Sequence, residues 1–259
     1  MLERVYQLRS YISYWLKKEE GYSLQSPKLF AIYKGLKCYL KVHKEVDLDI
    51  EAYRNKLLNL SKTIEIQDLG AGSKRLKASV RKVSEITKYS TSARKYAQLY
   101  QFFCSQTPAN QVIELGTCVG ITSRYLSRIT VGKMYTFEAS ASLVTIAKPK
   151  SNFKNLTIVE GDIHHTLPEL LAELNHIDFV LIDATHTYDA TISYFNNLVT
   201  RILPTSIIVI GDIHWSKDMN RAWEEIKVHQ MVKLSLDYFE CGIVYFDFPG
   251  PKSHYIMDL

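Results

Sequence analysis

The sequence has few cysteines, no long hydrophobic run and no internal repeat, and each absence removes a class of protein. Its four cysteines lie far apart and form no C-x-x-C pair, so neither a disulfide framework nor a zinc site is expected. No hydrophobic run approaches the roughly 18 residues that a membrane-spanning helix needs. The first residues have no long apolar core before a small-residue cleavage site, which argues against a signal peptide. Together these absences predict a cytoplasmic protein with reduced thiols.

Charge is distributed unevenly along the 259 residues. Residues 1–100 contain 20 lysines and arginines against 10 aspartates and glutamates, whereas residues 101–259 contain 12 against 17. A basic first half is compatible with an anionic substrate, a nucleic acid or a membrane surface. No dense basic block or known RNA-binding module is present, so solvation of exposed helix faces is the simpler interpretation and no nucleic-acid partner is favoured.

The first sixty residues are expected to form three helices. The second begins at Ser26-Pro27, because proline is favoured in the first helical turn, and the third covers residues 49–59. Apolar and aromatic residues of the first helix recur at helical spacing. Such a stripe is most often buried in a core or an oligomer interface, which includes a homodimer, and less often lies on a membrane surface. These residues are Leu8, Tyr11, Ile12, Trp15 and Leu16.

A glycine-rich segment at residues 68–73, D-L-G-A-G-S, is expected to be a connecting loop. The basic and polar residues 74–87 that follow it lack a strand that ends in an acid at the distance a nucleotide site requires. The alternative is an anion-binding loop assisted by Lys74, Arg75 and Lys77. We therefore predict a helical extension with its connecting loop over residues 1–89, and a second domain over residues 90–259.

From residue 92 onward, predicted helices alternate with predicted strands. A helix over 92–103, with Thr91 or Ser92 as its N-cap, precedes this region. Alternation of this kind predicts an α/β fold with a doubly wound, mostly parallel sheet, and two β-rich runs at its end predict an antiparallel hairpin. The seven expected strands are 111–115, 133–138, 156–160, 178–183, 206–211, 232–237 and 242–248; the helices between them are 121–129, 141–148, 166–175, 188–202 and 217–229.

The most informative motif spans residues 112–122, V-I-E-L-G-T-C-V-G-I-T. An apolar strand carries Glu114 near its end, a turn with Gly116 and Gly120 follows, and a helix begins near Ile121. Glycines let a ligand approach the backbone, and the N-terminus of a helix points toward it. The spacing G-x-x-x-G differs from the G-x-G-x-x-G of dinucleotide sites. This motif indicates a site for a nucleotide-like ligand at the carboxyl edge of the sheet.

This motif resembles the first motif of class I S-adenosylmethionine-dependent methyltransferases, in which E-L-G-x-x-x-G is a common form. The resemblance implies a Rossmann-like fold and S-adenosylmethionine as cofactor. Glu138 ends the next strand, where a carboxylate can bind both ribose hydroxyls. Asp162 and Ile163 resemble the pair that frames the adenine ring. The expected cofactor-binding residues are Glu114, Gly116, Thr117, Gly120, Thr122, Glu138, Asp162, Ile163 and Asp183.

Two later strands each end in an aspartate that a histidine follows: Asp183 with His186, and Asp212 with His214. If these strands are neighbours, the four side chains converge. Methyl transfer to a hydroxyl needs a base that takes the proton, or a metal that lowers the hydroxyl pKa. The expected catalytic residues are Asp183, His186 and His214.

These two segments resemble the catechol-type small-molecule O-methyltransferases. The resemblance matches Asp183 and Asp212 to metal ligands and His186 to the catalytic base. Ile213, however, stands where that family places a metal-binding asparagine, and isoleucine cannot bind a metal. With His214 as the third ligand, Asp183 and Asp212 would suit manganese, iron or zinc better than magnesium. The alternative is a metal-free mechanism with His186 or His214 as base.

Three further segments, residues 26–30, 68–73 and 212–217, together resemble a bacterial subgroup of class I methyltransferases with a helical N-terminal extension. This resemblance does not define the acceptor. Our hypothesis is methyl transfer to an oxygen of a small-molecule or lipid-like acceptor, with the divalent metal left open. Three alternatives remain. They are an NAD-dependent oxidoreductase, which the glycine spacing does not support, an RNA methyltransferase, and a non-catalytic module that binds a cofactor or a partner.

Overall fold

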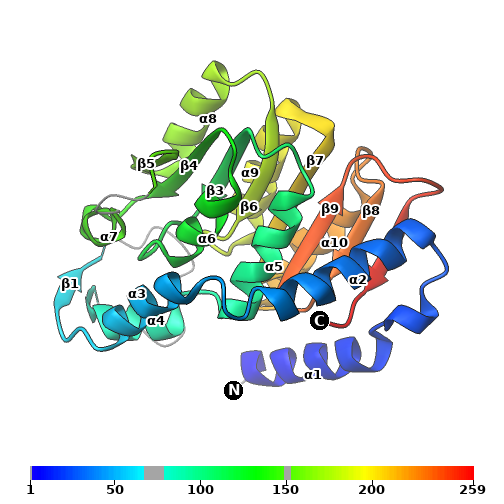
Figure 1. Cartoon of the computed structure of the whole chain (residues 1–259), viewed down its shortest axis with the longest axis horizontal. Helices are drawn as coiled ribbons and strands as arrows, with labels where there is room; N and C mark the ends of the chain where they lie inside the picture. The colour runs from blue at the N-terminus through cyan, green and yellow to red at the C-terminus, as the bar shows by residue number, and fades with distance from the viewer. Residues whose placement is uncertain (1, 67–78, 149–152) are drawn as a thin grey trace.

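The computed structural model describes residues 2–66, 79–148 and 153–259 of the chain (Figure 1). The segment 68–73 lies outside these residues. Helices and two short strands form the first part of the chain, and alternating strands and helices form the rest. The first part contains α1 (Leu2–Lys17), η1 (Gly21–Ser23), α2 (Pro27–Val42), α3 (Leu48–Leu58), β1 (Thr63–Glu65), β2 (Val80–Lys82) and α4 (Val83–Tyr89). The second part contains α5 (Arg94–Ser105), β3 (Gln111–Leu115), α6 (Ile121–Ile129), β4 (Lys133–Glu138), α7 (Ala141–Ala147), β5 (Leu156–Glu160), α8 (Ile163–Glu173), β6 (Ile177–Ile182), α9 (Tyr188–Leu198), η2 (Val199–Arg201), β7 (Ile202–Gly211), α10 (Lys217–Val228), β8 (Leu234–Asp237), β9 (Cys241–Tyr245) and β10 (Ser253–Ile256).

The central sheet has eight strands in the described residues, in the order β10-β8-β9-β7-β6-β3-β4-β5. Strands β3 to β7 are parallel, and β9 runs antiparallel to β7 and β8. The doubly wound, mostly parallel sheet and its terminal hairpin are therefore confirmed. The prediction of seven strands is one short, because β10 pairs in parallel with β8 and extends the edge of the sheet. Its sequence, S-H-Y-I, is too short and polar to stand out.

Alternate residues of the central strands pack into two hydrophobic cores, one on each face of the sheet. Ile113 and Val180 pack on the face that α8, α9 and α10 cover, whereas Val112 and Leu181 pack on the face that α2 and α5 cover. A strand has a side-chain period of two, so burial on both faces requires the nearly continuous apolar runs that predicted these strands.

Side chains of the helical extension share the core of the sheet. Leu29 and Leu36 of α2 are fully buried, and they lie in the same cluster as Phe103 of α5 and strand residues such as Val209. A third cluster joins Ile50 of α3 with residues of α4 and α6. The division at residues 89 and 90 stays a prediction, and the extension packs as part of one continuous molecule.

Two local features differ from what the sequence indicated. No element was predicted over residues 80–89, which were described only as part of the extension, but they form β2 and α4, in which Val83 and Ile86 are buried in the cluster that also contains residues of α3 and α6. Helix α5 begins at Arg94, two residues later than predicted, and its N-cap is Ala93, which makes no side-chain cap. The hydroxyl of Thr91 instead donates a hydrogen bond to the carbonyl of Thr87.

Helix α1 lies along the lower edge of the molecule and has few contacts with it (Figure 1). Gln7 Nε2 donates to the carbonyl of Trp215 at 3.0 Å, and the Tyr14 hydroxyl donates to the carbonyl of Met257 at 2.6 Å. The rings of Tyr11 and Tyr14 pack against Phe239. The apolar stripe of this helix faces outward and belongs to neither core. In the described residues, no helix is both long and apolar enough to cross a bilayer.

Candidate active site

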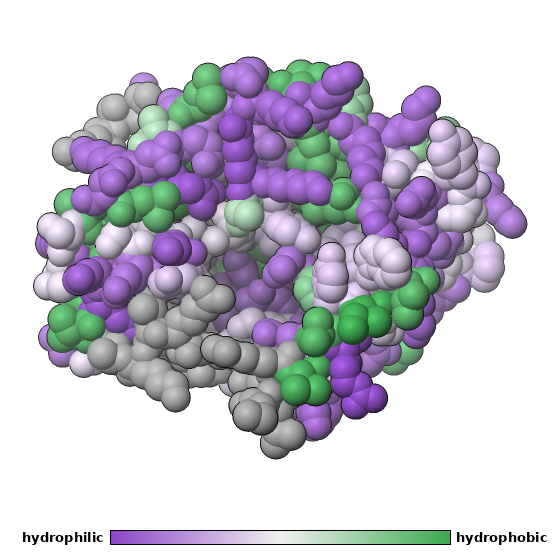
Figure 2. Space-filling model, turned by 90° about the horizontal axis from the view of Figure 1, so that it is seen from below, coloured by the Kyte–Doolittle hydropathy of each residue, from purple (hydrophilic) through white to green (hydrophobic). Residues whose placement is uncertain are grey.

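A cavity of about 690 Å³ opens where β3, β4, β6 and β7 end. Its mouth lies on the side of α1, where Figure 2 shows the surface hollowed near its centre. The volume falls within the range of small-molecule sites. A second chamber of about 320 Å³ adjoins the cavity, and the two share the lining residues Gln7, Asp212, Trp215 and Glu240.

The turn after β3 forms one wall of the cavity. Gly116 has a φ of +105°, and a Cβ at this position would lie 2.3 Å from the carbonyl oxygen of Asp183, so only glycine fits. The amides of Gly116 and Thr117 both donate to the carbonyl of Phe137, which ties the turn to β4. Gly120, with a φ of +74°, caps α6. Gly116, Thr117 and Thr122 all line the cavity.

Two acids at the ends of neighbouring strands also line the cavity. Glu138 ends β4, and its carboxylate accepts hydrogen bonds from the amides of Cys118 at 2.9 Å and Ser140 at 3.0 Å. Asp162 follows β5 and caps α8 by accepting from the amide of His164 at 2.9 Å. Ile163 lies beside it. These backbone donors hold both carboxylates in fixed positions on the wall that the glycine turn also forms.

Glu114 lies beneath this wall and does not line the cavity. Its side chain is fully buried and accepts hydrogen bonds from the hydroxyls of Ser123 and Thr136. Thr136 in turn is 2.7 Å from the hydroxyl of Thr117 in the turn. Glu114 therefore supports the turn from below. Gly120 likewise lies outside the lining, and it acts through the shape of the turn.

Burial raises the pKa of Glu114 to about 8, although the hydrogen bonds from Ser123 and Thr136 act in the opposite direction. The folded protein thus binds a proton here that the unfolded chain releases above its ordinary pKa of 4.5. The contribution of Glu114 to stability therefore falls as the pH rises from about 4.5 to 8, by at most about 1.4 kcal/mol per pH unit.

We expect Glu114→Gln to flatten this pH dependence, because glutamine cannot ionise. Urea unfolding at pH 5.5 and pH 8.5 measures it: the wild type should lose several kcal/mol between the two, and the variant clearly less. Glu173→Gln, a substitution at an exposed position of α8, is the control and should keep the wild-type slope. An unchanged slope in Glu114→Gln would show that other groups cause the pH dependence.

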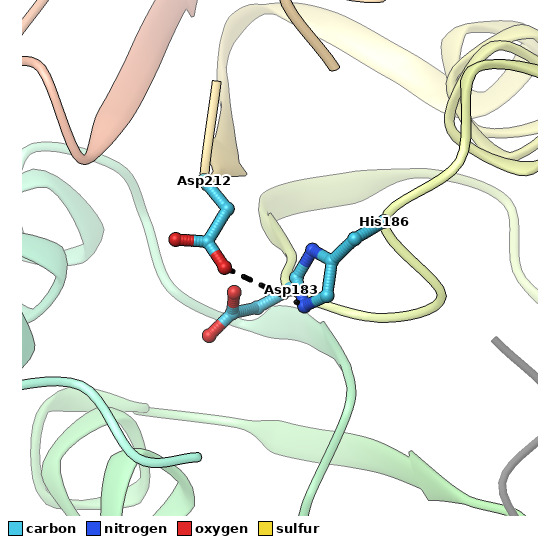
Figure 3. A group of neighbouring side chains, drawn as sticks. All are labelled: Asp183, His186 and Asp212. Atoms are coloured by element: carbon cyan, nitrogen blue, oxygen red, sulfur yellow. Dashed lines mark ion pairs between the residues drawn. The ribbon is translucent and has the colours of Figure 1, made fainter. Parts of the chain in front are cut away.

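Asp183, His186 and Asp212 converge at the cavity beside the glycine turn (Figure 3). They come from the end of β6, from the loop after it and from the residue after β7, and their potential ligand atoms all lie within 4.8 Å of one another. His186 Nε2 is 3.7 Å from Asp212 Oδ2. His186 and Asp212 have φ values of +50° and +56°, as does their neighbour Thr185 at +65°. Non-glycine residues seldom adopt this conformation, and it is typical of functional loops.

The carboxyl group of Asp183 is enclosed at the floor of the cavity. Burial raises the pKa of Asp183 to about 6. His186 lowers this pKa, the negative charge of Asp212 raises it, and a hydrogen bond from Ser92 lowers it. Gly211 makes room for the carboxylate, since a Cβ there would lie 2.3 Å from Asp183 Oδ1. Desolvated charges of this kind are typical of functional sites.

His214 does not join this group. Its Nε2 is 2.8 Å from Asp237 Oδ2, its ring stacks on Phe239, and it lines the second chamber. The three residues predicted as metal ligands, Asp183, Asp212 and His214, therefore do not converge. His186, and not His214, lies with the two aspartates. Ile213, at the position where an asparagine ligand was expected, is fully buried in the core.

Several lining residues were not identified from the sequence. Ser92, read as an N-cap, instead bonds Asp183, and Tyr96 and Tyr100 of α5 line the same cavity. Glu240 lies in the turn between β8 and β9, where burial, Asp212 and Asp183 raise its pKa to about 7 against the effect of His214. Ser92 and Glu240 are polar residues next to predicted element boundaries, whereas no sequence signal distinguished Tyr96 and Tyr100 within the predicted helix over 92–103.

The comparisons with known proteins agree with this geometry. Residues 113–213 match a family model described as a methyltransferase domain. No match is found among curated protein sequences. This segment begins in β3 and ends just after Asp212, so it contains the glycine turn, Glu138, Asp162 and the Asp183–His186–Asp212 group.

Solved structures share the fold. An O-methyltransferase from Bacillus cereus in complex with SAH aligns with a TM-score of 0.50 at 18% identity, over 60% of this chain and 82% of that chain. The SAH-bound methyltransferase PaMTH1 from Podospora anserina aligns with a TM-score of 0.53 at 14% identity, over 79% and 97%. TomG, an O-methyltransferase from Streptomyces achromogenes in complex with SAM, aligns with a TM-score of 0.50 at 15% identity, over 61% and 82%. The solved structures confirm the Rossmann-like fold, and the family model confirms a resemblance to methyltransferases over residues 113–213.

Proposed function

We propose that this protein, whose residues 113–213 form a methyltransferase domain, binds S-adenosylmethionine and transfers its methyl group to an oxygen of a small-molecule or lipid-like acceptor. One observation supports this most strongly. The glycine turn with its two carboxylates and the Asp183–His186–Asp212 group line a single cavity side by side, with Gly116 directly against the backbone of Asp183. A cofactor on the glycine turn would present its methyl group to an acceptor beside the second group. The SAM- and SAH-bound neighbours support the choice of cofactor.

The cofactor wall suits the parts of S-adenosylmethionine. The carboxylate of Glu138 can accept hydrogen bonds from both ribose hydroxyls, and Ile163 offers an apolar surface for the adenine ring beside Asp162. Gly116 and Thr117 bring backbone close to the ligand. Asp183 lies beside the glycine turn, where an ionised carboxylate would stabilise the positive sulfonium.

The transfer itself is a substitution at the methyl carbon. The acceptor oxygen forms a bond to this carbon while the bond to sulfur breaks, which leaves S-adenosylhomocysteine and a methyl ether or ester. The proton of the acceptor passes to the ring of His186. Asp212, 3.7 Å from Nε2, stabilises the resulting imidazolium. Positioning supplies the remaining acceleration, since the sulfonium is already an activated donor.

The same three side chains could hold a divalent cation. Two carboxylates and an imidazole form a donor set that suits manganese, iron or zinc. A cation there would lower the pKa of the acceptor hydroxyl in place of a base. We favour His186 as base, because Ile213 removes the oxygen ligand that a magnesium site would use.

The second chamber is suited to the body of the acceptor. Tyr11, Trp215 and Phe239 give it aromatic walls, and Asp212 and Glu240 connect it with the main cavity. An acceptor in this chamber would reach the methyl group from the side opposite the cofactor turn.

Calorimetric titration of the protein with S-adenosylmethionine tests the proposal. We expect micromolar binding that EDTA leaves unchanged, and no binding of NAD, because the turn lacks the dinucleotide spacing. Glu138→Gln should lower the affinity for S-adenosylmethionine by about 10- to 100-fold, since it removes a charged hydrogen-bond acceptor. Glu173→Gln is the matched control.

Absence of S-adenosylmethionine binding under all these conditions would refute the proposed function. Binding without formation of S-adenosylhomocysteine from any acceptor would instead favour the non-catalytic module.

A further inference from the structure

The apolar face of α1 is exposed although the helix is firmly oriented. Side chains on this face are between 48% and 70% exposed. With about 100° between successive residues, they share one side of the helix. Figure 2 shows the most hydrophobic of them as a stripe beside the hollow. Contiguous exposed apolar surface of this kind marks an interaction site. The face consists of Val5, Leu8, Tyr11, Ile12, Trp15 and Leu16.

The adjacent face of α1, which Tyr11 borders, holds this orientation. Gln7 and Tyr14 donate hydrogen bonds to the carbonyls of Trp215 and Met257, and Lys18 just after the helix pairs with Asp258 at 2.6 Å. The stripe therefore has an inner edge, where Leu8 and Tyr11 line the second chamber and Tyr11 packs on Phe239, and an outer part of Val5, Ile12, Trp15 and Leu16 that is left exposed. Rotation of the helix to bury the stripe would break these contacts.

The charged residues of α1 indicate which kind of surface would bind the stripe. Arg9 and Lys17 are exposed beside it, and residues 5–17 contain no acidic side chain. Tyr11 and Trp15 add aromatic rings that prefer the boundary between lipid and water. Basic residues next to an apolar face with tryptophan are typical of helices that lie in the interface of an anionic membrane.

We propose that α1 docks the protein on an anionic membrane surface, with this apolar face in the headgroup region. The mouth of the cavity would then face the lipids, because Gln7 lines the cavity and Leu8 and Tyr11 line the second chamber. This placement favours the lipid-like acceptor over the soluble one, a step that rests on the proposed function.

A second copy of the chain is the competing occupant of the stripe. Its spacing at residues 5, 8, 12 and 15 would also suit a pair of helices. Such a pair, however, would bring Arg9 and Lys17 of two copies together along the stripe, where α1 has no acid, since its one acidic residue, Glu3, lies at its start.

Co-sedimentation with lipid vesicles tests this proposal on the full chain. We expect the wild type to bind vesicles that contain phosphatidylglycerol and to bind those of phosphatidylcholine alone far more weakly. Trp15 fluorescence should shift to the blue on binding. The double variant Ile12→Gln/Leu16→Gln should lower partitioning by at least about 100-fold, because each side chain contributes about tenfold and glutamine preserves helix propensity.

Val131→Gln is the matched control. Val131 is 76% exposed but lies just before β4, at the opposite edge of the sheet, so its substitution should leave vesicle binding unchanged. The proposal fails if the wild type binds neither kind of vesicle, or if the double variant binds phosphatidylglycerol vesicles as strongly as the wild type does. It also fails if analytical ultracentrifugation finds a dimer that the double variant converts to a monomer, since a second copy then covers the stripe.

Titration with S-adenosylmethionine in the absence of lipid separates the two proposals. A protein that binds the cofactor but no vesicle refutes only the docking, and one that binds vesicles but no cofactor refutes only the proposed function.

Discussion

Replacement of His186 with alanine should slow methyl transfer by about 10²- to 10⁴-fold and leave the affinity for S-adenosylmethionine unchanged. His186 lines the main cavity, its Nε2 lies 3.7 Å from Asp212 Oδ2, and the proposed function assigns it the role of base. Without it, no base takes the proton from the acceptor hydroxyl as the new bond forms. Formation of S-adenosylhomocysteine with an acceptor that the wild type methylates measures the rate, and calorimetry measures cofactor binding.

His165→Ala controls for the loss of a histidine as such, because His165 is exposed on α8. Equal losses of rate and cofactor affinity in His186→Ala would contradict the role of base. A metal role gives a different pattern: EDTA would abolish wild-type turnover, manganese would restore it, and His186→Ala would lose manganese binding measured by calorimetry. His186 would then be a ligand of a cation.

Gly116→Ala should disrupt both stability and cofactor binding. The new Cβ would lie 2.3 Å from the carbonyl oxygen of Asp183, and the φ of +105° is itself unfavourable for alanine. Relief of the collision must move the turn or the end of β6, and both carry residues of the cavity. We expect a loss of about 2–4 kcal/mol in the free energy of unfolding and at least about 100-fold in affinity for S-adenosylmethionine. Urea unfolding and calorimetry measure the two effects.

Gly250→Ala isolates the contribution of the backbone conformation. Gly250 has a φ of +95°, but no heavy atom lies within 4 Å of the position of its Cβ. This variant should lose about 1 kcal/mol and bind cofactor normally. If Gly116→Ala loses no more stability than this control and keeps its affinity, then the turn accommodates a side chain and does not need glycine.

The sequence predicted the parts of the site that depend on local pattern. Glu138, Asp162, Asp183 and Asp212 each lie at or just after the end of a β-rich run, and parallel strands bring such ends to one edge. Their convergence therefore follows from topology alone. Gly116 was identifiable because the turn between a strand and a helix needs its conformation.

The remaining features depend on contacts between distant segments, which a local pattern does not contain. The sequence indicates that His214 is a metal ligand. In the structure its Nε2 lies 2.8 Å from Asp237 Oδ2 at the end of β8, a contact that the local sequence does not reveal. Ser92 has the composition of an N-cap, and only the fold brings it to Asp183. The sequence likewise does not show that residue 211 must be glycine, because the space beside it is filled by the side chain of Asp183, which directly follows β6.

The attachment of α1 to residues 256–258 has a consequence for synthesis on the ribosome. The carbonyl that accepts the Tyr14 hydroxyl bond is 243 residues further along the chain, and the backbone of Glu19 bonds Ile256 and Asp258. At typical translation speeds α1 waits roughly 12 to 50 s before this anchor exists. During that time its apolar stripe has no fixed orientation, so the nascent chain offers a binding site to chaperones, and the α1 wall of the second chamber is among the last parts to assemble.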